Sequence, residues 1–255
     1  MPEKENIENN RKTWNAVSDL FINGSSLPVW APFGVGEDLN LIPEIKNKVF
    51  LEIGCGSGRS IKHLTDRGAK KVYGLDVSDE QVKESKKHNE EAIKKGVVEI
   101  IQAPMEEKLS IEPVDVVFSI YGIGWTQNPE KTLSNIFSYL KSGGRFIWSW
   151  DHSFFTDVAY EDGKYVVQYS YHDERPIEIK DWKKEGHTAR ITYRKIDTWF
   201  KLLIDAEFQV VGYHEPKPKN TDRAHKEPEK YYSIQKAEKV PATFIFVCEK
   251  PEMQA

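Results

Sequence analysis

The stretch Val49-Phe-Leu-Glu-Ile-Gly-Cys-Gly-Ser-Gly58 decides the fold. An apolar run of strand length leads into three glycines at alternate positions, and a helical pattern follows to Arg67. Glycines in such a turn let the backbone approach a bound ligand, where a Cβ would block contact or force a strained φ. Glu52 precedes the turn, where its carboxylate would attract an ammonium group and repel a pyrophosphate.

A second acid follows in the place that a nucleoside site requires. Asp76 ends the next apolar run, Lys71 to Leu75, in Val-Tyr-Gly-Leu-Asp. A carboxylate at the end of a second strand can accept hydrogen bonds from both hydroxyls of a ribose. The alternative is a purely local role, in which the glycines form a tight turn and Asp76 caps the next helix. The order of strand, glycine turn, helix, strand and acid favours the nucleoside site.

The rest of the chain alternates strand and helix patterns. Further strand-length runs lie at 97–101, 114–120, 145–150, 208–213 and 243–248. Helical patterns cover 79–95, a segment that opens at Asn128-Pro129 and ends at Gly143-Gly144, and 196–204. We therefore expect an α/β, doubly wound, Rossmann-like fold with a seven-stranded, mostly parallel sheet and a ligand crevice at the strand carboxyl ends. The last strand is expected to be antiparallel, at an edge.

Composition excludes several classes of function. The chain has 255 residues, 39% hydrophobic and 30% charged, with a net charge of −4, so it offers no basic field for nucleic acid or an anionic membrane. It shows no signal peptide and no apolar run long enough to span a bilayer, and its two cysteines predict no disulfide framework. We expect a cytoplasmic protein without a membrane partner. The seven histidines lack metal-ligand spacing, so no metal is predicted.

At this point the sequence resembles the class I S-adenosylmethionine-dependent methyltransferases, in particular their bacterial small-molecule branch. Glu52 to Gly58 looks like the first motif of that family, and Gly68 to Ser78 looks like the second. Asp115 to Ser119 is similar to the fourth-strand motif, and Leu140 to Phe146 to the turn before the fifth strand. The resemblance is good from Val49 to Trp150 and fainter beyond.

The resemblance implies where S-adenosylmethionine would bind. Its methionine part would face Glu52 and the glycines, Asp76 would take the ribose, and Val77 would pack on the adenine. The residues expected around the cofactor are Glu52, Gly54, Cys55, Gly56, Gly58, Asp76, Val77, Pro104, Met105, Ser119 and Ile120. One departure concerns the adenine amino group, which an Asp near Ala103 or Pro104 commonly binds in the family. Either backbone groups replace that Asp here, or a neighbouring side chain does, with Gln102 and Glu106 as the candidates.

The acceptor is expected at the ends of the fourth and fifth strands. Trp30, Tyr121, Trp125, Trp150 and His152 are the residues predicted to contact it, and His152 is also the candidate base, because a neutral imidazole can accept a proton near pH 7. The alternative for His152 is a structural hydrogen bond within a wall. Methyl transfer from a sulfonium needs in-line alignment, desolvation and removal of any acceptor proton.

The resemblance also suggests the domain organisation. Residues 1–47 would form an N-terminal lid, with Trp14, Phe21 and Trp30 as its aromatic contacts, and residues 48–255 the methyltransferase domain. A small cap is expected at about 151–190, and a charged loop, anchored by Tyr231-Tyr232, at about 215–240. Identity of the acceptor and the oligomeric state, monomer or weak dimer, stay open.

Two other functions compete with a methyltransferase. A nicotinamide-dependent oxidoreductase also uses a strand, a glycine turn and a distant acid, but it expects GxGxxG without an adjacent carboxylate. The second alternative is a protein that binds S-adenosylmethionine without catalysis. We therefore predict an enzyme that methylates a small molecule.

Overall fold

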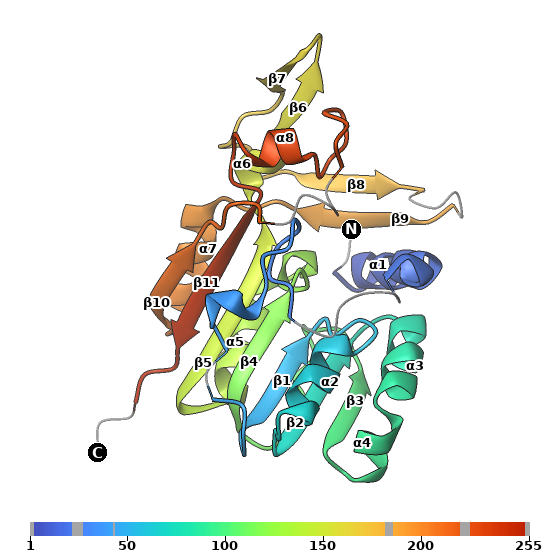
Figure 1. Cartoon of the computed structure of the whole chain (residues 1–255), viewed down its shortest axis with the longest axis vertical. Coiled ribbons are helices and arrows are strands. Elements are labelled where there is room, and N and C mark those ends of the chain that lie inside the picture. Colours follow the sequence, from blue (N-terminus) through green and yellow to red (C-terminus); the bar gives the residue numbers. More distant parts are fainter. Residues whose placement is uncertain (1–2, 22–27, 43, 182–185, 220–224, 253–255) are drawn as a thin grey trace.

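A seven-stranded mixed sheet forms the centre of the computed structural model (Figure 1), which describes residues 3–21, 28–42, 44–181, 186–219 and 225–252. The strand order is β10-β11-β5-β4-β1-β2-β3, and every pairing is parallel except those of β11. The chain runs outward from β1 through β2 to β3 and then returns to β4 on the other side of β1. This reversal opens a crevice at the carboxyl ends of β1 and β4.

The first half follows the predicted order of elements. It consists of β1 (Val49–Ile53), α2 (Arg59–Asp66), β2 (Lys71–Asp76), α3 (Asp79–His88), α4 (Glu90–Lys94), β3 (Val98–Gln102) and β4 (Val114–Ile120). The helix predicted over 79–95 is divided at Asn89. The Asn89 side-chain amide donates to the carbonyls of Gly58 and Ser85, which turns the chain between α3 and α4.

The second half contains α5 (Pro129–Tyr139), β5 (Leu140–Asp151), α7 (Ile196–Asp205), β10 (Gln209–His214), α8 (Ile234–Ala237) and β11 (Thr243–Glu249). Asn128 caps α5 as predicted, since its side chain accepts the N–H of Lys131 at 3.1 Å. The predicted stop at Gly143-Gly144 is wrong, because α5 ends at Tyr139 and both glycines lie within β5. The parallel register of β4 and β5 shifts there, and Gly143 has a φ of +71°.

The last strand is antiparallel, as predicted, but its expected place at an edge is wrong. β11 pairs with β5 on one side and β10 on the other, so β10 forms the edge. Phe244, Ile245 and Phe246 of β11 are fully buried, whereas β10 alternates exposed and partly buried residues. The more apolar strand therefore takes the interior position.

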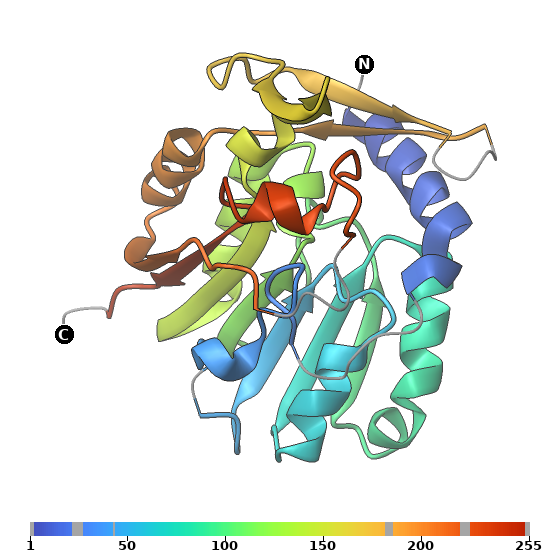
Figure 2. The same cartoon turned by 45° about the horizontal axis from the view of Figure 1, so that its top comes forward.

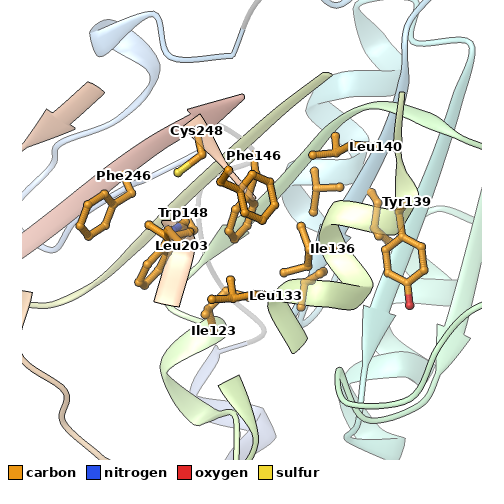
Figure 3. Packing of buried hydrophobic residues seen from close by; sticks show 14 of the residues in the cluster. Ile123, Leu133, Ile136, Tyr139, Leu140, Phe146, Trp148, Leu203, Phe246 and Cys248 are labelled. Atoms are coloured by element: carbon orange, nitrogen blue, oxygen red, sulfur yellow. The ribbon is translucent and has the colours of Figure 1, made fainter. Parts of the chain in front are cut away.

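Helices cover both faces of the sheet. On one face α5 and α7 pack Leu133, Ile136, Trp199 and Leu203 against β4, β5 and β11, around the fully buried Trp148 (Figure 3). On the other face α2 and α3 bury Ile61, Leu64 and Val82. Burial of such side chains contributes roughly 1.5–3 kcal/mol each, so these two layers fix the positions of the strand ends that form the site.

The carboxyl ends of the strands are covered by segments outside the sheet (Figures 1 and 2). At the N-terminus α1 (Glu3–Val17) lies beside β9 and α3. Between β5 and α7 the chain forms α6 (Ser153–Thr156) and two hairpins, β6 (Val158–Glu161) with β7 (Lys164–Val167) and β8 (Pro176–Lys180) with β9 (Thr188–Thr192). Parts of the predicted lid, cap and charged loop, namely 1–2, 22–27, 43, 182–185 and 220–224, fall outside the described residues. Among the helices described, none is both long and apolar enough to cross a bilayer.

Candidate cofactor and acceptor site

A cavity of about 470 Å³ lies at the carboxyl ends of β1, β2 and β4, beneath α1. This volume is within the range of small-molecule sites. The lining residues come from five parts of the chain: Ile7, Asn10, Trp14, Phe21 and Val29; Glu52 to Ser57, Arg59 and Ser60; Leu75 to Val77 and Gln81; Ala103 to Glu106; and Ile120 to Gly122 with Trp125.

The glycine turn after β1 has the conformation that its sequence predicts. Gly54 and Gly56 have φ values of +70° and +51°, which other residues rarely adopt. The N–H of Gly54 donates to the carbonyl of Leu75 at 2.8 Å, so the turn is held against the end of β2. A Cβ on Gly54 would stand 3.0 Å from the Cα of Gly122. The two backbones therefore approach closely at the floor of the cavity.

Glu52 brings an incompletely paired carboxylate to this floor. Glu52 is only 3% exposed, and its Oε2 atom has no hydrogen-bond partner among the residues that the structure describes. Burial raises the pKa of Glu52 well above its ordinary value, a hydrogen bond from Ser60 opposes this, and the charge of Asp76 adds to it. A buried acceptor oxygen without a partner costs folding free energy unless a hydrogen-bond donor or a cation pairs with it. The position therefore suits the ammonium group of an amino-acid ligand.

Asp76 joins the second strand to the glycine turn. Its Oδ2 accepts the N–H of Gly56 at 2.9 Å, and its Oδ1 accepts the N–H of Ser78 at 2.9 Å. Burial raises the pKa of Asp76 above its ordinary value, and the bonds from these amides and from Val77 act in the opposite direction. Each carboxylate oxygen can accept a further hydrogen bond, so a diol can still bind here.

The wall beyond Asp76 is apolar, as a flat base would require. Val77, Ala103, Pro104 and Met105 line it. Of the two candidates for the missing Asp, Gln102 does not line the cavity and donates through Nε2 to Asp79 Oδ1 at 2.6 Å. Glu106 does line it, but Glu106 Oε1 already accepts Thr126 Oγ1 at 2.9 Å and the N–H of Gln127 at 2.7 Å.

Aromatic rings close the other end of the cavity. Tyr121 and Trp125 follow β4 directly and line the cavity with Gly122. Trp14 of α1 lies against Trp125, with ring centroids 5.3 Å apart in an edge-to-face arrangement. Helix α1 is thereby connected to the part of the cavity in which an acceptor is expected.

Two residues expected at the cofactor do not line the cavity. Gly58 faces the next helix, where an added Cβ would be 2.2 Å from Ser85 Oγ. A glycine is required at position 58 because the helices pack closely there and because the φ of this residue is +73°. Ser119 is fully buried within β4 and donates its hydroxyl to the carbonyl of Ile53 at 2.7 Å.

Two of the expected acceptor residues lie in the core instead. Trp30 is fully buried and contacts Phe118, with ring centroids 6.3 Å apart. Trp150 is 3% exposed and lies one layer behind Tyr121 and Trp125, against Gly124. From sequence alone, a large aromatic residue that lines a cavity near a strand end cannot be distinguished from one that packs behind the lining residues.

His152, the predicted base, is placed outside the cavity lining. It caps α6, because its Nδ1 accepts the N–H of Phe154 at 3.2 Å. Its Nε2 lies 3.2 Å from Glu215 Oε1. Both ring nitrogens thus have protein partners. This arrangement fits the alternative role for His152, a structural hydrogen bond within a wall.

Sequence reasoning missed several lining residues from α1 and α2. Ile7 and Asn10 of α1 reach the cavity, and Asn10 exchanges two hydrogen bonds with the backbone of Arg190 in β9, at 2.9 and 2.7 Å. Only pairing of α1 with a hairpin almost 180 residues away brings them there, so no local pattern could have shown it. Ser60 follows the glycine turn on α2 and could have been expected from that position alone.

Known methyltransferases resemble this chain in both sequence and fold. A family model for methyltransferase domains matches residues 51–148, the region that carries the glycine turn, Asp76 and β4. A solved structure, a putative S-adenosylmethionine-dependent methyltransferase from Listeria monocytogenes, superposes with a TM-score of 0.68 at 25% identity, over 85% of this chain and 97% of that one. The chain therefore contains a region similar to methyltransferase domains and has the fold of S-adenosylmethionine-dependent methyltransferases.

The relatives of this chain carry different names. An uncharacterized protein of Haemophilus influenzae is 26% identical over 200 residues, covering 74% of this chain and 78% of that protein. An S-adenosyl-L-methionine-dependent Diels-Alderase of Talaromyces variabilis is 28% identical over 128 residues, 46% of this chain and 44% of that protein. tRNA U34 carboxymethyltransferases of Shewanella baltica are 27% identical over 106 residues, 42% of this chain and 32% of each of those proteins.

S-adenosylmethionine is the cofactor of the methyltransferases that this chain resembles, and the cavity fits it. The unpaired Glu52 Oε2 can receive its ammonium group, and the backbone of Gly54 and Gly56 lines the cavity beside it. The apolar wall suits a base. When bound, the cofactor supplies an electrophilic methyl group on a sulfonium.

Proposed function

We propose that this protein is a methyltransferase that transfers the methyl group of S-adenosylmethionine in line to a small-molecule acceptor. The observation that carries the proposal is the buried, unpaired oxygen of Glu52 beside the glycine turn and Asp76. An enzyme that binds a pyrophosphate there would place negative charge against a buried carboxylate. A cationic group would instead pair with the Glu52 carboxylate. This preference disfavours a nicotinamide-dependent oxidoreductase.

We assign the cofactor contacts to residues that line the cavity. Glu52 would bind the ammonium group, Asp76 the ribose hydroxyls, and Val77, Pro104 and Met105 the adenine. The backbone of Gly54 and Gly56 would lie against the methionine part. Ile120 would stand near the sulfonium, which directs the methyl group toward Tyr121 and Trp125.

The acceptor is expected to be a small molecule. The cavity has about 470 Å³ for the cofactor and acceptor together, and α1 lies over it. The net charge of −4 offers no general attraction for a nucleic acid. Closure of such a cavity removes water from the reacting groups and holds them in line, which is the main task in transfer from a sulfonium.

Helix α1 is proposed as the cover of this cavity. Its side chains connect three places: Asn10 binds β9, Asn15 binds Asp79 and Ser78 at the start of α3, and Glu3 binds Asn128 before α5. These elements surround the strand ends. Release of α1 would therefore open the cavity to ligands, and its return would exclude water.

A second candidate is a protein that uses bound S-adenosylmethionine without transferring its methyl group. The similarity to an S-adenosyl-L-methionine-dependent Diels-Alderase favours this candidate. A solved [4+2]-cyclase shares the fold, with a TM-score of 0.62 at 14% identity. Neither likeness assigns a reaction to this chain.

Release of adenosylhomocysteine tests which candidate is right. The full chain is incubated with S-adenosylmethionine and a metabolite library that contains hydroxyl, amine and thiol acceptors. The proposal predicts acceptor-dependent release of adenosylhomocysteine and loss of that release in Glu52→Gln. Tight binding of the cofactor without release across the library would favour the second candidate.

A further inference from the structure

A buried carboxylate surrounded by tyrosine hydroxyls lies behind the acceptor end of the cavity. Asp151 ends β5 and is 4% exposed. The hydroxyl of Tyr232 donates to Asp151 Oδ1 at 2.9 Å and lies 3.1 Å from Oδ2, and the hydroxyl of Tyr231 donates to Oδ2 at 3.2 Å. Tyr231 and Tyr232 come from the segment before α8, so their bonds to Asp151 connect this segment to the sheet.

Other charged and titratable groups face this carboxylate from several elements. They are Tyr121 after β4, Tyr193 after β9, Lys236 of α8 and, beyond Lys236, Asp157 after α6. Lys236 is 4% exposed, and its Nζ lies 3.9 Å from the centroid of the Phe155 ring. Burial raises the pKa of Asp151 to about 7, while hydrogen bonds from Tyr232, Tyr231 and Tyr121 and the charge of Lys236 act in the opposite direction. Burial lowers the pKa of Lys236 to about 8.

Tyr121 connects this cluster to the cavity. Its side chain lines the cavity beside Gly122, and its hydroxyl hydrogen-bonds Thr243 and interacts with the Asp151 carboxylate. Its backbone has a φ of +54°, a left-handed conformation that is costly for a residue with a large side chain, and its N–H donates to the carbonyl of Ser149 at 3.1 Å. The fold thus holds Tyr121 between the cavity and Asp151 with a strained backbone.

We propose that Tyr121 and Asp151 form the route by which the acceptor's proton leaves, and that the acceptor is a small aromatic compound with a neutral hydroxyl. This inference rests on the proposed methyl transfer. Rings of Trp14, Phe21, Tyr121 and Trp125 line the acceptor end, which suits an aromatic compound. Among the described lining residues Arg59, on the cofactor side, carries the only full positive charge, so nothing at the acceptor end favours an anionic acceptor.

The proton and electron count of the step balances. The acceptor oxygen forms a bond to the methyl carbon as the carbon–sulfur bond breaks, and that electron pair stays on sulfur. The acceptor proton moves to the Tyr121 oxygen while the Tyr121 proton moves to Asp151. The positive charge of the sulfonium and the negative charge of Asp151 disappear together, so the step creates no new charge in a poorly solvated site.

Two matched acceptors test this route. The full chain is supplied with S-adenosylmethionine and either 4-methylphenol, which must lose a proton, or 4-methylbenzenethiol, whose thiol is already ionised at pH 8. Asp151→Asn is expected to slow methylation of the phenol about 100-fold, which is the contribution of a general base, and to slow methylation of the thiol at least tenfold less.

Equal losses of rate for both acceptors would show that Asp151 only supports the fold. Turnover of the thiol but not the phenol by wild type would leave methyl transfer in place and overturn the proton route. Turnover of neither acceptor, nor of any compound in the metabolite library, would remove the proposed function, and the route with it.

A spectroscopic readout does not depend on turnover. In the complex with adenosylhomocysteine, the infrared difference between wild type and Asp151→Asn should contain a protonated-carboxyl stretch that titrates near neutral pH. Tyr231→Phe removes a hydroxyl from Asp151 without touching the cavity, so it should move that titration, and the pH midpoint for the phenol, to higher pH. A carboxyl that keeps one protonation state from pH 5 to 9 would overturn the proposal.

Discussion

The Asp76 carboxylate accepts the backbone N–H of Gly56 at 2.9 Å, so the acid that ends β2 also holds the glycine turn that follows β1. The second oxygen accepts the N–H of Ser78, which begins the approach to α3. One side chain therefore fixes two backbone segments that line the cofactor cavity. Any change at Asp76 is expected to alter both the ligand contacts and the shape of the site.

Asp76→Asn should weaken binding of adenosylhomocysteine by about 1–3 kcal/mol, because it removes charge-assisted hydrogen bonds to the ribose. The thermal midpoint should fall as well, since an amide offers one acceptor oxygen in place of two. Titration calorimetry measures the affinity. Asp66→Asn is the matched control, because Asp66 is exposed at the end of α2, pairs with Lys62 on the same helix and does not line the cavity. Equal affinity of Asp76→Asn and wild type would show that this carboxylate does not hold the ligand.

Glu52→Gln should have opposite effects on stability and on binding. It replaces a buried carboxyl, one oxygen of which has no partner, with a neutral amide, so the free protein should be more stable toward denaturant at pH 8. The same change removes the anionic partner of the ammonium group and should weaken adenosylhomocysteine at least tenfold, a typical effect of a charge-assisted bond. A variant that lost stability and kept its affinity would contradict the assigned role.

The first part of this site could be predicted from sequence because its residues are local. The glycine turn, Glu52 and Asp76 lie within two consecutive strand-to-loop transitions, and the order of strands brings those transitions together. The prediction that Gly58 contacts the cofactor is not met, because Gly58 does not line the cavity. In sequence, a glycine required by helix packing cannot be distinguished from one required by a ligand. The φ of +73° and the contact with Ser85 appear only in three dimensions.

The acceptor end was less predictable because it is built from distant segments. The chemistry of Trp30, Trp150 and His152 and their proximity to strand ends predict contacts with the acceptor. The structure places the tryptophans in the core and gives both nitrogens of His152 protein partners. Asp151 lies next to His152 in the chain, but no local pattern distinguishes it. Its significance depends on Tyr231 and Tyr232, about 80 residues later, whose hydroxyls reach it. Similarly, the interior place of β11 depends on which of two strands buries more apolar surface.

The affinity for adenosylhomocysteine should rise with pH above about 4.5. The pKa values of Glu52 and Asp76 are both raised in the free protein, so the folded chain holds protons that the unfolded chain has lost. Stability of the free protein should therefore fall as pH rises through these raised pKa values. Ammonium binding needs ionised Glu52, so binding should release protons. Calorimetry in buffers of different ionisation enthalpy measures that release, and proton uptake would contradict this assignment.

Asn10→Ala should loosen α1 over the cavity. The substitution removes two hydrogen bonds to the backbone of Arg190 and leaves those groups unpaired, a cost of about 1–3 kcal/mol. Amide exchange of residues 3–17 should become faster, and adenosylhomocysteine should dissociate faster. Lys12→Ala, on the same helix but 49% exposed at its side chain, is the control. Faster exchange without any change in ligand dissociation would show that α1 does not cover the site.

The most direct test of the cofactor assignment is a calorimetric titration of the full chain with adenosylhomocysteine and, separately, with NAD⁺. The account predicts a single site for adenosylhomocysteine that is weakened in both Glu52→Gln and Asp76→Asn, and no measurable binding of the dinucleotide. Tight binding of NAD⁺, or adenosylhomocysteine binding that neither substitution affects, would contradict it.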